Sequence, residues 1–388
     1  MGNTTSEDLE GSGFVTYDLS KKEKDILNKT SDGYGKMVAK LKEKQATQLK
    51  LLLLGAGESG KTTVLRQMTL IHGTGFDDNY KKKMKPKICY NVLEGAVAII
   101  ESFGNLNYTV EGEDLQKAVD LILETYSPLK NFSLELEPKL ADAILLLAKS
   151  DGFEDTFRGK AHDLPDGWWI FAERLKKYPA WGGPDWIPDA SDILYSRVRT
   201  TGINTQSFAV NGANFMLTDV GGQRNERRKW LRLFSGVAGV VYVASLSGYN
   251  QVLFEDRTAN RLDEAVGLWD KTVNEKEFKD TAMVVFLNKF DLFQKKYYHE
   301  KIPIEYKGSF VTELGHTPPK AEDEKDESCE NAIEWFTELY LSKCTTKRRK
   351  MVYTHVTTAL DRNHMKIVMD SCAIHMMQQS LMNSGLSL

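Results

Sequence analysis

The stretch that decides the fold of this chain is Leu51-Leu52-Leu53-Leu54-Gly55-Ala56-Gly57-Glu58-Ser59-Gly60-Lys61-Thr62. Its four leucines indicate a buried β-strand, and apolar residues at helical spacing follow from Val64 to His72. The second half fits the pattern G-x-x-x-x-G-K-[ST], whose glycines let backbone N–H groups surround phosphates. Because the pattern stands between a strand and a helix, we predict a phosphate-binding loop rather than a plain glycine turn.

The side chains of this loop carry separate predicted roles. Lys61 would reach the β- and γ-phosphates of a nucleotide, and the Thr62 hydroxyl would bind Mg²⁺. The helix that begins near Lys61 adds the positive end of its dipole to the site. The residues of this stretch that we expect to contact the nucleotide are Gly57, Glu58, Ser59, Gly60, Lys61, Thr62 and Thr63.

A second segment, Asp219-Val220-Gly221-Gly222-Gln223-Arg224, follows a predicted strand that ends at Thr218. Asp219 can hold a water bound to Mg²⁺, and the Gly222 N–H can bond a γ-phosphate without steric conflict. The pattern D-x-x-G is weak alone, because any junction between a strand and a turn can show it.

A third segment, Asn288-Lys289-Phe290-Asp291, concerns the base and not the phosphates. The Asp291 carboxylate would accept from N1–H and the exocyclic amine of guanine, a donor pair that adenine lacks. Lys289 would lay its aliphatic stem across the ring, and Asn288 would brace the loop. A solvated turn is the alternative for this quartet taken alone.

A fourth segment, Thr357-Thr358-Ala359, ends the last predicted strand, and the Ala359 N–H could donate to guanine O6. Together with Thr358 it completes the predicted base contacts. Each of the four segments lies at the carboxyl end of a strand, where a doubly wound sheet gathers its ligand. The sequence therefore predicts one guanine-nucleotide site.

The rest of the chain divides into a helical part and an alternation of strands and helices. Residues 75–193 show four apolar helical faces and no period-two alternation, which predicts an all-helical domain. Six strands in a βα alternation predict a mostly parallel, doubly wound α/β sheet covered on both faces. The predicted strands are Leu51–Leu54, Gln206–Asn211, Phe215–Asp219, Val237–Ser245, Ala282–Asn288 and Met351–Val356. The predicted helices after Arg199 are Glu226–Leu233, Asp256–Val273, Cys329–Lys343 and Asn363–Asn383, and Ala321–Glu330 is taken as an acidic loop.

Composition narrows the function class only coarsely. The 51 basic and 54 acidic residues leave a net charge of -3, which argues against a general affinity for nucleic acid. No apolar run approaches the ~18 residues that a membrane-spanning helix needs. The start, Met1–Glu10, lacks the hydrophobic region of a secretory signal. The four scattered cysteines fit reduced thiols of a cytosolic protein.

From about Leu49 to its end, the sequence resembles the α subunits of heterotrimeric G proteins. A helical insertion lies between the phosphate-loop helix and the second strand, as in that family. Arg197–Ile203 resembles the first switch region, and Asp219–Trp230 resembles the second switch and its helix. The long loop form Gly55–Lys61 is also typical of the family.

The resemblance implies a domain plan. Residues 49–74 and 197–388 would form a P-loop GTPase domain of the Ras-like kind, and residues 75–196 an inserted all-helical domain. Residues 1–48 would form an N-terminal segment for contact with a membrane and a βγ dimer. We expect a helix there from about Lys36 to Gln48.

The resemblance also implies roles for single residues. Arg197 would be an arginine finger supplied in cis and would pair with Glu58, and Gln223 would orient the attacking water. Thr200 would be the second side-chain ligand of Mg²⁺ beside Thr62. The resemblance implies three further nucleotide contacts from the helical insertion: Asp151, Leu194 and Tyr195.

By this resemblance the chain would be a GTP-hydrolysing switch that carries signals from a membrane receptor to effectors. An ATP-dependent kinase or ATPase on the same scaffold is a rival, against which Asn288–Asp291 argues. A non-catalytic nucleotide-binding module is a second rival, and the presence of both Arg197 and Gln223 argues against it.

The partners implied are Mg²⁺, GTP or GDP, a seven-helix receptor, effectors and GTPase-accelerating proteins of the RGS type. The GDP form would bind a βγ dimer, partly through Lys229 and Trp230. Met1–Ser6 fits M-G-x-x-x-[ST], so Gly2 is a candidate for myristoylation. The expected location is the cytoplasmic face of the plasma membrane and the cytosol. The lipid anchor would hold the chain on the inner membrane surface.

Overall fold

The computed structural model describes residues 48–106, 108–126, 134–150, 167–178, 180–210, 213–253, 256–349 and 351–383. The chain forms two compact units: one runs up to Gly73 and resumes at Thr200, and the other is Thr74–Arg199. Gly2, Asp151 and all of the expected N-terminal helix except Gln48 lie outside the described residues. Within the described part, no helix combines the length and the apolar character needed to cross a membrane.

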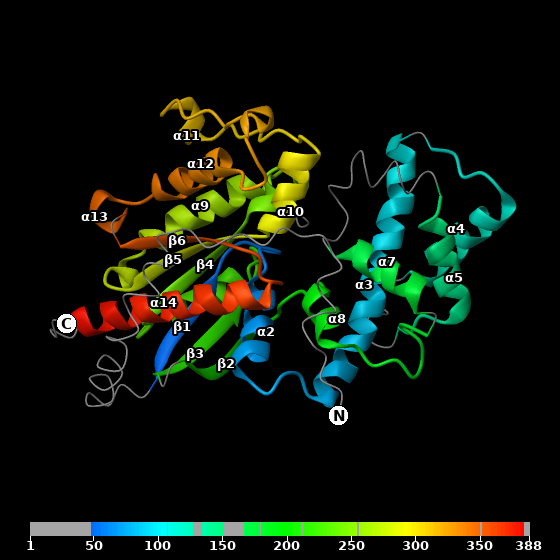
Figure 1. Ribbon diagram of the computed structural model, residues 1–388, viewed down its shortest axis with the longest axis horizontal. Helices are drawn as coiled ribbons and strands as arrows, with labels where there is room; N and C mark the ends of the chain where they lie inside the picture. Colours follow the sequence, from blue (N-terminus) through cyan, green and yellow to red (C-terminus); the bar gives the residue numbers. More distant parts are fainter. Residues whose placement is uncertain are drawn as a thin grey trace. The chain divides into compact units, whose positions relative to one another are not determined.

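The first unit is built on one six-stranded sheet, in the order β2-β3-β1-β4-β5-β6 (Figure 1). β2 runs antiparallel to β3, and the other neighbouring pairs are parallel. The mostly parallel α/β sheet expected from the sequence is confirmed. The strands are β1 Leu49–Leu54, β2 Ile203–Val210, β3 Ala213–Val220, β4 Gly239–Ser245, β5 Ala282–Asn288 and β6 Val352–Thr357.

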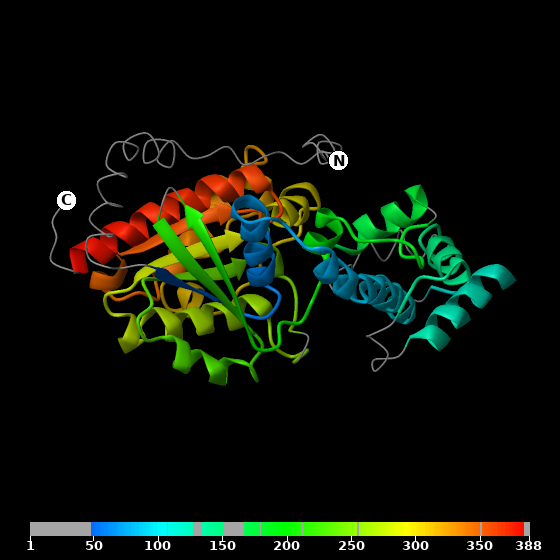
Figure 2. The same cartoon turned by 90° about the horizontal axis from the view of Figure 1, so that it is seen from below.

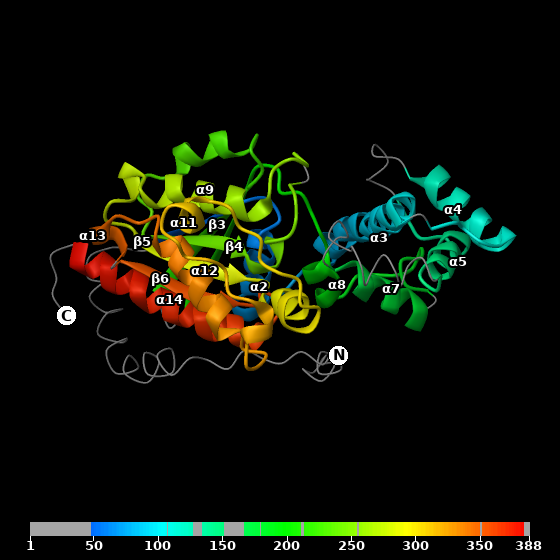
Figure 3. The same cartoon turned by 90° about the horizontal axis from the view of Figure 1, so that it is seen from above.

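Helices cover both faces of this sheet, and Figures 2 and 3 show α9 and α14 on opposite sides of it. Side chains of a strand point alternately to the two faces. Leu52 and Leu54 of β1 therefore belong to the core with α9 and α12, whereas Leu51 and Leu53 belong to the core with α2 and α14. This double burial explains the uninterrupted leucines. The main helices of the unit are α2 Lys61–His72, α9 Arg261–Val273, α12 Glu330–Leu341 and α14 Arg362–Asn383.

Some boundaries differ from the sequence-based expectation. The expected helix Glu226–Leu233 is the 3-10 helix η3, Arg227–Leu233. α9 begins at Arg261 instead of Asp256, because the Asn260 side chain caps it by accepting from the Leu262 N–H at 2.7 Å. The short elements that the sequence did not predict are η4 Leu246–Gly248, η5 Lys276–Phe278, α10 Phe290–Gln294, η6 Lys295–His299, α11 Ser309–Thr312, η7 Ala321–Asp323 and α13 Thr346–Arg349.

The described residues of the second unit are helical and contain no strand, as expected. The helices are α3 Asp78–Leu106, α4 Glu113–Thr125, α5 Pro138–Leu147, α7 Trp168–Lys177 and α8 Ala190–Tyr195. Pro138 occupies the first turn of α5, where its missing N–H costs nothing. A buried apolar cluster joins α3, α4, α5 and α7 into one core.

Candidate functional site

The loop between β1 and α2 has a backbone that requires glycine at two positions. Gly55 has φ +140°, and a Cβ there would meet the Val243 carbonyl oxygen at 2.2 Å. Gly60 has φ +102°, and a Cβ there would meet Nδ2 of Asn288 at 2.3 Å. The loop is therefore wrapped tightly against β4 and β5, with the Gly60 carbonyl starting α2 through the Val64 N–H at 2.9 Å.

The ammonium of Lys61 lies inside this loop. Its Nζ donates to the carbonyl oxygens of Gly55 at 3.0 Å and of Ala56 at 2.8 Å. Burial lowers the pKa of Lys61 to about 8, and the carboxylate of Asp219 offsets part of that effect. Phosphate oxygens carry full charge and would bind this ammonium more strongly than neutral carbonyls do.

Three oxygen-bearing side chains converge beside Lys61. The Thr62 hydroxyl donates to Oδ2 of Asp219 at 2.6 Å, and its oxygen lies 2.6 Å from Oγ1 of Thr200. Asp219 lies inside β3 and not directly after the strand, because β3 extends to Val220. It is fully buried, which raises the pKa of its carboxyl although Lys61 opposes the shift.

This group suits Mg²⁺ by two features. All the side-chain atoms that could ligate the ion are oxygens, which Mg²⁺ prefers. Oδ1 of Asp219 is buried and has no hydrogen-bond partner among the described residues. With one carboxylate, the site would leave most ligand positions to water and phosphate, as Mg²⁺ sites at nucleotides do.

Gly222 and Gln223 pack against the phosphate loop. A Cβ on Gly222 would lie 2.3 Å from Nζ of Lys61 and 2.5 Å from the Gly55 oxygen, so the backbone of Gly222 closely approaches the loop. A Cβ on Gly57 would lie 3.3 Å from Cγ of Gln223. Oε1 of Gln223 is buried and has no hydrogen-bond partner within the part of the chain that the structure describes.

The helix η3 is tied to this glycine pair. Nε of Arg227 donates to the Gly222 oxygen at 2.9 Å, and Nε1 of Trp230 donates to the Gly221 oxygen at 3.0 Å. Arg227 also pairs with Glu264 of α9 at 2.6 Å. Trp230 is only 4% exposed, so its ring could contact a partner only if η3 moved.

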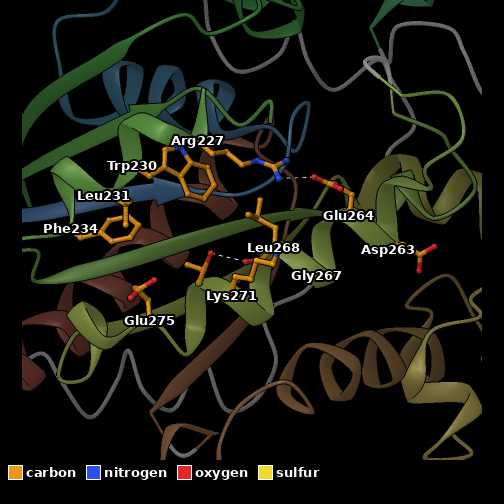
Figure 4. A pocket seen from close by; sticks show the side chains of 11 residues that line it. Arg227, Trp230, Leu231, Phe234, Asp263, Glu264, Gly267, Leu268, Lys271 and Glu275 are labelled. Atoms are coloured by element: carbon orange, nitrogen blue, oxygen red, sulfur yellow. Dashed lines mark hydrogen bonds and ion pairs between the residues drawn. The ribbon is translucent and has the colours of Figure 1, made fainter. Parts of the chain in front are cut away.

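A groove of about 390 Å³ separates η3 from α9 (Figure 4). Its η3 wall carries apolar side chains, among them the exposed Leu231, and its α9 wall carries charged ones. Arg227 lines this groove and also bonds the Gly222 oxygen, so it connects the groove to the glycine pair. The residues that line it are Arg227, Trp230, Leu231, Phe234, Asp263, Glu264, Gly267, Leu268, Lys271, Thr272 and Glu275.

Asn288 connects three of the four predicted segments. Its Nδ2 donates to the Ser59 oxygen at 2.9 Å, and its Oδ1 accepts from the Thr357 hydroxyl and the Ala359 N–H, each at 3.1 Å. Asn288 is 1% exposed, so these bonds are shielded from water. The Ala359 N–H, predicted to donate to guanine O6, is here a donor to Asn288, and its contact with a base stays a prediction.

The other residues predicted to contact the base are chain neighbours of Asn288 and Ala359. Lys289 adopts φ +63° directly before α10, and Asp291 lies in the first turn of that helix. Lys289, Asp291 and Thr358 are each partly exposed, so a ligand can reach them.

The remaining predicted contacts belong to the helical unit. The Arg197 N–H donates to Oδ1 of Asn91 at 2.9 Å, and its guanidinium lies 3.8 Å from Oε2 of Glu94. Leu194 and Tyr195 form the end of α8. The expected pairing of Glu58 with Arg197 would join the two units and stays a prediction.

One contact at the phosphate loop was not predicted from the sequence. Nη1 of Arg261 pairs with Oε2 of Glu58 at 2.8 Å, while Nε of Arg261 donates to the Val252 oxygen at 2.8 Å. The one available signal was Asn260 as a helix cap, which would have placed Arg261 at a helix start but not beside Glu58.

Comparison with known proteins agrees with the family resemblance of the sequence. The family model described as G-protein alpha subunit matches residues 28–376. The guanine nucleotide-binding protein subunit alpha of Sporothrix schenckii is 33% identical over 343 residues, which cover 88% of this chain and 92% of that protein. The proteins of the same name from Pyricularia oryzae and Cochliobolus heterostrophus are each 32% identical, with the same coverage of 88% and 92%.

Proposed function

Because the chain belongs to the G-protein α subunit family, we propose that the residues assembled around Lys61 run its nucleotide cycle. The chain is a guanine-nucleotide-binding GTPase that acts in signal transduction. The observation that carries the proposal is the convergence of Lys61, Thr62, Asp219 and Gly222 within one cluster, of which only Thr62 is partly exposed. Lys61 and the Gly222 N–H suit a terminal phosphate, and Thr62 and Asp219 suit its cation.

In the proposed reaction, each residue acts on a separate part of the substrate. Lys61 binds the β- and γ-phosphates, and the Gly222 N–H donates to the γ-phosphate. Gln223 accepts from the attacking water through its Oε1 and orients it in line. Arg197 neutralises charge that develops as the phosphoryl group leaves. Mg²⁺ held by Thr62 and Thr200 would neutralise phosphate oxygens, with Asp219 bonded to one of its waters.

The switch would work through Gly222 and η3. With GTP bound, the Gly222 contact holds η3 through Arg227 and shapes the groove beside α9, which would receive effectors. Hydrolysis removes the γ-phosphate and with it this restraint. We propose that η3 then moves, exposes Trp230, and binds a βγ dimer through Trp230 and Lys229. A seven-helix receptor would promote the release of GDP, and RGS-type proteins would accelerate hydrolysis.

Nucleotide-state capture tests the switch. The purified chain is loaded with GDP or with a non-hydrolysable GTP analogue and incubated with βγ dimer in Mg²⁺. We expect the GDP form to retain βγ and the analogue form to release it. Equal retention in both states would contradict the proposed coupling, and a chain loaded with GDP but lacking βγ in the mixture sets the background.

Base specificity is tested by Asp291→Asn. We expect weaker binding of GTP and stronger binding of XTP, because the amide still accepts from N1–H and its NH₂ meets the carbonyl of xanthine. Loss of one buried hydrogen bond to guanine costs roughly 1–3 kcal/mol, or about 5- to 150-fold in affinity. Competition binding measures both values. Asp185→Asn, at an exposed aspartate of the helical unit, is the control. Unchanged GTP affinity in Asp291→Asn would remove the basis for the base assignment.

We also propose a lipid anchor at Gly2, supported by the motif Met1–Ser6. One myristoyl chain binds membranes with a constant of only about 10⁴ M⁻¹. Residues 21–44 hold eight lysines and four acidic residues, so 8 minus 4 leaves +4 to attract an anionic leaflet. We expect membrane association that is reversible and weakened by salt. Fractionation of wild type and Gly2→Ala at low and high salt measures it, and a Gly2→Ala chain that stays membrane-bound at high salt would refute both contributions.

A further inference from the structure

We infer that Asn91 is the positioning residue for Arg197: it fixes the backbone of the arginine finger to α3 of the helical unit. The inference rests on the proposed role of Arg197 in hydrolysis. It assigns to a residue of the helical unit a part in the chemical step itself. Three features of that unit carry it.

The first feature is the rigid setting of α3 around Asn91. Nε1 of Trp168 donates to the Val92 oxygen at 2.8 Å, and Trp168 is 1% exposed. The indole lies so close to Gly95 that a Cβ there would meet its Cδ1 at 1.9 Å. Since Trp168 clamps α3 directly after Asn91, the position of the Asn91 side chain is well defined.

The second feature is the firm attachment of the segment that leads to Arg197. α8 begins with a capping box in which Asp189 and Asp192 each accept from the other's backbone N–H, at 2.7 and 2.9 Å. Arg174 of α7 pairs with Oδ1 of Asp192 at 2.7 Å. At the other end of α8, the Ser196 hydroxyl donates to the Ile193 oxygen at 2.8 Å. Side-chain contacts therefore hold this segment from Asp189 to Ser196, directly before Arg197.

The third feature is the bond that holds Arg197 itself. Oδ1 of Asn91 accepts from the Arg197 N–H at 2.9 Å, and Asn91 is only 6% exposed. Asparagine is a poor residue for a helix interior, so its place here depends on what its side chain binds. This hydrogen bond holds the peptide group of Arg197 and does not use its guanidinium.

Glu94, one turn further along α3, contributes less. Its carboxylate lies 3.8 Å from the Arg197 guanidinium, and both side chains are about a quarter exposed, at 25% and 29%. Such a pair is weak and screened by salt. The hydrogen bond from the Arg197 N–H to Asn91 is therefore a stronger restraint on Arg197 than this ion pair is.

The test is a double-mutant cycle in single-turnover GTP hydrolysis, with analogue affinity measured in parallel. The four proteins are wild type, Asn91→Leu, Arg197→Ala and the double variant. We expect Asn91→Leu to slow hydrolysis about tenfold, since a misplaced catalytic group costs up to ~10²-fold, with analogue affinity unchanged. In the Arg197→Ala background the same substitution should have no further effect. A merely structural role would slow both backgrounds equally.

Two further variants complete the design. Asn91→Asp keeps an oxygen that can accept from the Arg197 N–H and should hydrolyse GTP within about threefold of wild type. Asn91→Ala replaces Asn91→Leu if the larger side chain lowers the thermal midpoint. Equal slowing in both backgrounds, or no slowing by Asn91→Ala and Asn91→Leu, overturns the inference. An Arg197→Ala protein that hydrolyses GTP at the wild-type rate overturns the proposed role of Arg197 instead.

Discussion

Replacing Arg197 by cysteine is expected to slow single-turnover GTP hydrolysis by at least about 10³-fold and to leave the affinity for a GTP analogue nearly unchanged. The guanidinium would neutralise charge that appears only as the γ-phosphoryl group departs, so its loss raises the barrier without weakening the ground state. The range of about 10³–10⁵ is the known effect of arginine fingers in GTPases of this class.

The measurement is phosphate release after GTP loading, started by adding Mg²⁺. Lys139→Cys is the matched control, because it introduces the same thiol and removes an exposed cation on α5 of the same unit. We expect this control to hydrolyse GTP like the wild type. A rate for Arg197→Cys within about threefold of the control would mean that charge neutralisation comes from another residue.

The sheet and the ligand edge were predictable because their signals are local. Four consecutive leucines before a glycine indicate a strand buried on both faces, and the cores on the two sides of β1 have that origin. The boundaries of η3 and α9 were less predictable. Arg227 and Trp230 hold η3 by bonds to the Gly222 and Gly221 carbonyls, a tertiary effect that no helical periodicity contains.

The residues of the candidate site also divide into those that were predictable from the sequence and those that were not. Lys61, Asp219 and Asn288 each belong to a short pattern at the end of a strand, so the sequence alone located them. Arg261 and Asn91 have no such pattern. Each lies in a helix far along the chain from the residue that it holds, Glu58 or Arg197, and only the fold brings them into hydrogen-bond range.

Gln223→Leu should bind GTP like the wild type but hydrolyse it on the order of 10²-fold more slowly, because the attacking water is no longer oriented. In the structure the Gln223 side chain lies against Gly57, and its Oε1 is buried with no hydrogen-bond partner among the described residues. No protein donor among the described residues competes for that oxygen, so we expect it to accept from a water beside the γ-phosphate when GTP is bound. Leucine has a similar volume and should keep the packing, but it carries no acceptor.

Single-turnover hydrolysis and analogue binding separate the two effects of Gln223→Leu. Gln116→Leu, on the exposed face of α4, makes the same chemical change away from the nucleotide and should behave like the wild type. Gln223→Leu should also stay in the GTP-bound form, so that it still fails to retain βγ long after GTP loading. If it instead hydrolyses GTP at the control rate, the water is oriented by another group. If Arg197→Cys also hydrolyses GTP at the rate of its own control, the catalytic site lies elsewhere.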